Sequence, residues 1–138
     1  SPNVKHAATV QSNSLTELIE YSEIKLPWPL KNRDFMIHAK ANLDQKNKSA
    51  LIEMRSIDFT YDFSSKRAVR GQLLNGDVKL VSLDNDTRTK IDVILIADPK
   101  GGIPKWLVNF FQKSWPYEML TGLKKHLSKD FSVTKYFE

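Results

Sequence analysis

The sequence predicts an α+β fold in which a curved antiparallel β-sheet wraps around one long C-terminal helix, with an internal hydrophobic cavity. Apolar and polar residues alternate along 35–43 and 87–97, the pattern of half-buried antiparallel strands. Residues 103–127 instead carry apolar side chains three and four positions apart, which indicates a helix. Strands followed by a single helix pack as a sheet against that helix. Because this helix is apolar on several sides, we expect a ligand to fill part of the space beneath it.

The chain has 138 residues, 41% of them hydrophobic, and no cysteine. This length suits one domain with its own core, so we expect residues 1–138 to form a single unit. No apolar run approaches the length of a membrane-spanning helix, and the N-terminus lacks the apolar core of a signal peptide. A chain without cysteine has no disulfide and no thiol chemistry, which fits a reducing compartment, and we expect a cytoplasmic protein.

The first half of the chain reads as four strands joined by polar turns, at residues 4–12, 16–26, 35–43 and 49–57. The first two strands meet at a turn over Asn13-Ser14, residues that turns favour. In the second strand, Leu18, Glu20 and Ile24 share one face. A loop over 27–34 follows, and two prolines stiffen it.

The second half continues the sheet and ends in the helix. Residues 67–83 read as a long or broken strand interrupted near Asn75-Gly76, and 87–97 as a regular strand. The apolar face of this last strand consists of Ile91, Val93, Leu95 and Ala97. The helix over 103–127 follows Gly101-Gly102, a turn with the backbone freedom of a hinge. Its apolar side chains include Trp106, Leu107, Phe110 and Phe111.

The net charge of +5 is concentrated on the helix. Residues 1–99 hold 14 basic and 13 acidic residues, whereas 100–129 hold six lysines and one glutamate. One interpretation is a solvated helix face, and the other is a surface for an anionic partner such as lipid head groups. We expect transient contact with an anionic membrane and no nucleic-acid binding, because the helix is too apolar for the latter. Trp28 either joins this contact, as tryptophan suits membrane interfaces, or packs in the core.

The sequence contains no motif for a metal, a cofactor or a catalytic nucleophile. His6, His38 and His126 are far apart and no cysteine assists them, so no metal site is expected. The paired glycines lack the Lys-Ser/Thr ending of a phosphate-binding loop, and no G-x-S-x-G motif is present. We therefore expect a protein that is not an enzyme and needs no cofactor.

Two long motifs stand in a specific order and separation. The first runs from Pro27-Trp28-Pro29 to Arg33-Asp34-Phe35, and the second is DPKGGIPKWLVN over residues 98–109. Together they resemble the START (StAR-related lipid-transfer) domain family of the helix-grip, or SRPBCC, superfamily. The resemblance implies a helix-grip fold with a hydrophobic tunnel for one lipid. It also implies that the C-terminal helix and the loop over 27–34 form a lid.

The resemblance covers only the middle and C-terminal part of the family's domain. The family's first helix, first three strands and following helices have no counterpart in these residues. Either the chain is a fragment, or a partner chain replaces those elements. Some sterol-binding members carry a buried Glu and Arg pair; Glu20 matches the acidic position, but Ala39 stands at the basic one. The missing basic residue disfavours a sterol ligand. A buried carboxylate without that partner must be protonated, hydrated or paired elsewhere, and Arg55 and Arg70 are candidate partners.

We therefore expect a lipid-binding or lipid-transfer domain that holds one hydrophobic ligand between the sheet and the helix. The predicted ligand-binding residues are Leu18, Glu20, Ile24, Trp28, Ile37, Ala39, Arg55, Val93, Leu95, Leu107, Phe110 and Phe111, with Gly101 and Gly102 as the predicted hinge. One alternative is a helix-grip enzyme of the polyketide cyclase or aromatase kind, with Glu20 and Arg55 as acid–base groups. Another is a protein-interaction module that uses the basic helix.

Overall fold

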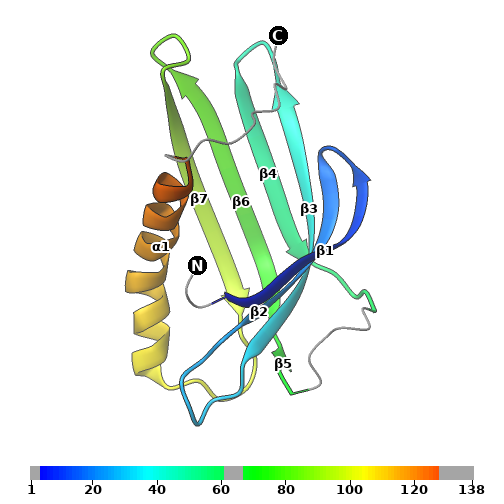
Figure 1. The fold of residues 1–138 in the computed structure, drawn as a ribbon, viewed down its shortest axis with the longest axis vertical. Helices are drawn as coiled ribbons and strands as arrows, with labels where there is room; N and C mark the ends of the chain where they lie inside the picture. Colours follow the sequence, from blue (N-terminus) through cyan, green and yellow to red (C-terminus); the bar gives the residue numbers. More distant parts are fainter. Residues whose placement is uncertain (1–3, 61–66, 128–138) are drawn as a thin grey trace.

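The computed structural model describes residues 4–60 and 67–127 and contains one seven-stranded sheet with a helix beside it (Figure 1). The elements are β1 (Val4–Ser14), β2 (Glu17–Ile24), β3 (Arg33–Asp44), β4 (Ser49–Ser56), β5 (Val69–Arg70), β6 (Gln72–Leu83), β7 (Arg88–Asp98) and α1 (Lys105–Leu127). The strand order is β1-β2-β3-β4-β6-β7, and the short β5 pairs in parallel with β3. All other pairings are antiparallel, which confirms the predicted antiparallel sheet.

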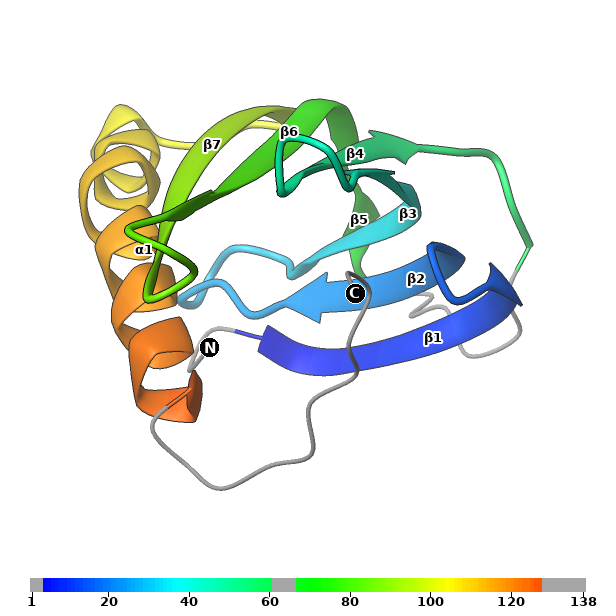
Figure 2. The same ribbon diagram turned by 90° about the horizontal axis from the view of Figure 1, so that it is seen from above.

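The sheet is strongly curved, as predicted. Viewed from above, it bends from β7 round to β1, and α1 lies at the open side of the curve (Figure 2). We call the face turned towards α1 the inner face and the opposite one the outer face. Cross-strand register places apolar rows on the inner face, among them the row Ala41, Ile52, Val78 and Val93 and the row Ala39, Met54, Gly76 and Leu95. Paired residues share a face, so the alternation seen in the sequence becomes one continuous apolar surface.

A compact buried cluster lies on the outer face. Ile19, Tyr21 and Met36 are buried there, and the half-buried Val10, Ile57 and Phe59 pack against them. Tyr21 and Met36 are cross-strand partners, so this cluster joins β2 to β3 directly. The tightly packed part of the molecule is therefore on the side of the sheet away from the helix, and the inner face is more open.

The break within residues 67–83 falls at Gly71, between β5 and β6, and not at Gly76 as expected. An added Cβ at Gly71 would lie 2.6 Å from the ring of Phe35. The missing side chain thus lets the aromatic ring lie against the backbone. Near the predicted interruption, β6 remains continuous and only shifts register between Leu73 and Asn75.

The two edge strands of the sheet differ. The register of β1 with β2 shifts at three places, between Val4 and His6, Thr9 and Gln11, and Ser12 and Ser14. Along β7, large apolar side chains are exposed on both faces: Val93, Ile94, Leu95 and Ile96. One edge is therefore irregular and the other is long and apolar.

Helix α1 begins immediately after Pro104, whose carbonyl oxygen accepts bonds from the backbone N–H groups of Leu107 (3.0 Å) and Val108 (3.3 Å). Leu107 is 1% exposed and is the only buried side chain among those described on the helix. It is therefore the main apolar anchor of α1 in this set. No helix in the described ranges is both long enough and apolar enough to cross a bilayer.

Candidate functional site: a pocket between the sheet and the helix

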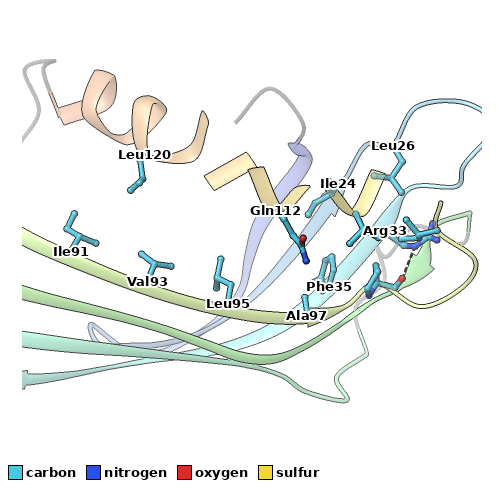
Figure 3. Close-up of a pocket in the computed structure, with 13 residues that line it drawn as sticks. Ile24, Leu26, Arg33, Phe35, Ile91, Val93, Leu95, Ala97, Gln112 and Leu120 are labelled. Carbon is cyan, nitrogen blue, oxygen red and sulfur yellow. Dashed lines mark hydrogen bonds between the residues drawn. The ribbon is translucent and has the colours of Figure 1, made fainter. Parts of the chain in front are cut away.

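A pocket with a volume of about 640 Å³ lies between the inner face of the sheet and α1 (Figure 3). It is lined by Ile24, Leu26, Arg33, Phe35, Ile91, Val93, Leu95, Ala97, Pro99, Ile103, Val108, Gln112 and Leu120. Among the described residues of this lining, only Arg33 and Gln112 are polar. A mostly apolar pocket of this size, with a few polar groups, has the properties of small-molecule binding sites.

The wall on the sheet side comes from alternate residues of the edge strand β7. Ile91, Val93, Leu95 and Ala97 all contribute to it, because every second side chain of a strand points to the same face. Val93 and Leu95 each keep 36% of their surface exposed. The space above them is thus not filled by protein atoms, unlike the buried cluster on the outer face.

Arg33 lies at the end of the pocket beside the β7–α1 connection and is 5% exposed. Its Nε donates to the carbonyl oxygens of Pro99 (2.7 Å) and Lys100 (3.2 Å), and Nη2 donates to that of Lys100 (3.0 Å). Nη1 donates to the carbonyl oxygen of Lys31 at 2.5 Å. Burial lowers the pKa of Arg33 from its ordinary value. One side chain therefore fastens the loop after β2 to the segment that leads into the helix.

The predicted hinge has an unusual backbone. Lys100 and Gly101 have φ angles of 54° and 71°, in the left-handed region that favours glycine. Asp98 holds Lys100 there, since its Oδ1 accepts from the Lys100 backbone N–H at 2.9 Å and its Oδ2 lies 2.6 Å from Nζ. An added Cβ at Gly102 would meet open space. Of the two predicted hinge glycines, only Gly101 is thus required by its backbone angle.

Glu20 lies half-buried on the inner face of β2, in register with Ile37 and on the same face as Ile24. Within the described ranges the structure records no ion pair or hydrogen bond for its carboxylate. Desolvation raises the pKa of Glu20 above its ordinary value. Its neutral form is therefore favoured more than in an exposed glutamate.

The two arginines expected as partners of Glu20 are engaged elsewhere. Arg55 lies on the outer face, with Nη1 at 3.0 Å from Asp77 Oδ1. Arg70 Nε lies 2.9 Å from Oδ1 of Asp34, which is 2% exposed. In the described part of the chain, neither candidate arginine is therefore recorded as a partner of Glu20. Because Glu20 and Arg55 lie on opposite faces, they also cannot act together as an acid–base pair.

The predicted ligand-binding residues divide into four groups. Three of them line the pocket: Ile24, Val93 and Leu95. Others lie on the inner face but outside this lining: Leu18, Glu20, Ile37 and Ala39. Trp28 is 92% exposed, which excludes its packing in the core. Leu107 is buried on α1, and Arg55 lies on the outer face. The side chains of Phe110 and Phe111 lie outside the described residues.

Sequence reasoning missed both polar side chains of the pocket. Arg33 belongs to the Arg-Asp-Phe motif but was not assigned to the binding site. Gln112 interrupts the apolar pattern, yet it lies four residues after Val108 and eight before Leu120, and all three line the pocket. Helical spacing from an apolar neighbour could have indicated it.

Several titratable groups on the outer face have structural partners. Tyr21 Oη donates to Asp34 Oδ2 at 3.2 Å, and Asp34 also binds Arg70. His38 Nε2 lies 2.7 Å from Glu17 Oε1, and this hydrogen bond lowers the pKa of Glu17. Among the residues that the structure describes, no cluster of three or more His, Cys, Asp or Glu side chains could hold a metal ion.

Comparison with known proteins supplies further evidence. The family model for the START domain matches residues 1–130. An uncharacterized protein of Pseudomonas aeruginosa is 31% identical over 109 residues, covering 79% of this chain and 52% of that protein. The mouse phosphatidylcholine transfer protein is 23% identical over 116 residues, covering 83% of this chain and 54% of that protein. The chain thus spans about half the length of the curated relatives it matches.

Two solved structures resemble the fold. A STAR-related lipid transfer protein of Xanthomonas axonopodis is 26% identical with a TM-score of 0.76, covering 93% of this chain and 70% of that one. Human STARD10 also gives a TM-score of 0.76, at 21% identity, covering 91% of this chain and 50% of that one.

Proposed function

The chain belongs to the START domain family, and from this premise we propose that it binds one lipid or similar hydrophobic ligand between the sheet and α1. The observation that carries the proposal is the pocket of about 640 Å³, lined by apolar side chains except for Arg33 and Gln112. Burial of apolar ligand surface there supplies roughly 25 cal/mol per Å² as a gross driving force. The similarity to phosphatidylcholine transfer protein supports a lipid as the ligand class.

In this proposal the curved sheet and the helix together enclose the ligand as a helix-grip domain. The helix then acts as a lid that moves at Gly101-Gly102, and the loop over 27–34 is the fixed side. The exposed apolar residues along β7 suit pairing with a further strand from outside this chain. Such a strand would complete the wall of the pocket.

Ligand exchange would take place at an anionic membrane surface. Two features support this contact: Trp28 is 92% exposed, and six lysines with one glutamate lie in residues 100–129. Tryptophan is favoured at the lipid–water interface, and a lysine close to an anionic bilayer contributes on the order of 1 kcal/mol.

Native mass spectrometry of the purified protein, followed by organic extraction, tests the proposal. We expect a species heavier than the chain by one lipid, and extraction should return that lipid. Val93→Asp places a charge in the pocket and should abolish the heavier species. Ile94→Asp is the matched control on the next residue of β7, which faces the other side, and should retain it. A protein that neither carries a lipid nor takes one up from vesicles would contradict the proposal.

A further inference from the structure

The pocket has a distinct polar end. Figure 3 shows Ile91, Val93 and Leu120 towards one end and Arg33 at the other, with the side chain of Gln112 directed towards Phe35 between them. All other lining residues are apolar. The two ends therefore suit the two parts of an amphiphile, a chain and a head group.

Arg33 is a buried cation without a carboxylate partner among the described residues. Its recorded bonds all go to backbone carbonyl oxygens. Asp34, next to Arg33 in the chain, pairs with Arg70 on the outer face, and Asp98, which precedes the segment bound by Arg33, pairs with Lys100. A buried charge is costly unless an opposite charge accompanies it. Because Arg33 lines the pocket, an anionic group of a ligand bound there could supply that opposite charge.

The guanidinium also has N–H groups that are not used in its recorded hydrogen bonds. It carries five N–H groups, and the recorded bonds engage Nε and one N–H on each terminal nitrogen. One further N–H on Nη1 and one on Nη2 have no recorded acceptor in the described part of the chain. Terminal guanidinium N–H groups bind carboxylate and phosphate oxygens strongly, and in pairs where the geometry allows it.

We propose that Arg33 receives the oxyanion of an anionic amphiphile, a carboxylate or a phosphate, while the chain of that ligand lies along Ile91, Val93 and Leu120. Gln112 contributes a second, neutral donor from the helix. The inference rests on the proposed function and names the ligand class for the same pocket.

The charges around this end favour the same ligand. Lys31, whose carbonyl oxygen binds Arg33, is an exposed cation, and the first turn of α1 contains no acidic residue. The start of a helix carries the positive end of its dipole. Together these groups attract an anion towards the polar end of the pocket.

Three ligands with one chain length separate head-group recognition from apolar burial. Titration calorimetry at pH 8, below the micelle concentrations, would compare dodecanoate, dodecyl phosphate and dodecanol. We expect at least one of the two anions to bind 10-fold or more tightly than the alcohol, and the tighter anion identifies the head-group chemistry. Equal affinities for all three would overturn the inference and leave the proposed function standing. No binding by any of them would overturn both.

A change on the helix avoids disturbing the bonds that Arg33 makes to the backbone. Gln112→Glu places a carboxylate in the pocket between its apolar end and Arg33, where the new charge repels the ligand anion. We expect it to weaken binding of the anions at least fivefold, and to weaken dodecanol binding less, because the new carboxylate does not repel an uncharged head group. Asn109→Asp makes the same charge change on the same helix outside the pocket lining and should leave all three affinities unchanged. Equal weakening by both variants would show that overall helix charge, and not Arg33, selects the anion.

Discussion

Replacing Leu107 with alanine should loosen the attachment of α1 while leaving the strands folded. Leu107 is 1% exposed, whereas Leu123 on the same helix is 39% exposed and does not line the pocket. The tightly packed cluster of the sheet lies on the outer face and does not include the helix. A cavity at Leu107 should therefore affect α1 much more than the strands.

The size of the effect follows from burial. Truncation of a fully buried leucine to alanine costs about 2–5 kcal/mol. About 1.4 kcal/mol changes an equilibrium tenfold. The population with a detached helix should therefore increase by a factor between roughly 30 and several thousand. Leu123→Ala is the matched control, and truncation at an exposed site should cost less than about 1 kcal/mol.

Hydrogen exchange followed by mass spectrometry would measure both variants. We expect the amides of α1 to exchange much faster in Leu107→Ala than in Leu123→Ala, with β2, β3 and β4 unchanged in both. Release of a bound lipid should accelerate in the same variant, because the helix covers the pocket. Equal exchange in the two variants, or faster exchange throughout the sheet, would refute Leu107 as the anchor of a movable helix.

Three further predictions concern other parts of the protein. The raised pKa of Glu20 means that its ionised form destabilises the folded state, so wild-type stability falls as pH rises from the ordinary pKa through the raised one. In urea denaturation, the free energy of unfolding of Glu20→Gln should equal that of the wild type near pH 4 and be equal or slightly higher at pH 7. The variant should also show an altered ligand preference. A large loss of stability would instead indicate a buried ion pair. In liposome sedimentation, binding should increase with anionic lipid and decrease with salt, and Trp28→Ala should weaken it; equal binding to neutral and anionic vesicles would contradict membrane contact through charge. A disulfide between cysteines introduced at Leu30 and at Val108 or Phe111, whichever lies within reach, should stop uptake and release of a fluorescent lipid until it is reduced; undiminished exchange by the oxidised form would mean that the ligand uses another route.

Strand and helix periodicity predicted the architecture well because both patterns are local. Alternation along β3 and β7 identified the inner face, and Val93 and Leu95 indeed line the pocket. The break in residues 67–83 was predicted near Asn75-Gly76 but lies at Gly71. Its position depends on the ring of Phe35, which comes from another strand. Sequence patterns do not report such contacts between distant segments.

The polar chemistry of the site was harder to predict for the same reason. The position of Arg33 at the end of the pocket depends on the β7–α1 connection, more than sixty residues later, whose carbonyl oxygens bind the guanidinium. The partners of Arg55 and Arg70 likewise depend on strand register, which a sequence does not specify. Glu20 was expected to be a buried carboxylate because it matches the family's acidic position, and it lies half-buried on the inner face.

The contrast between the two edges of the sheet affects how this protein meets other strands. The three register shifts of β1 distort its outer rim, and a distorted rim is a poor template for backbone pairing. The exposed valine, isoleucine and leucine side chains of β7 instead suit the addition of a strand. This same strand supplies one wall of the pocket. Any strand that adds to β7 would therefore widen that wall.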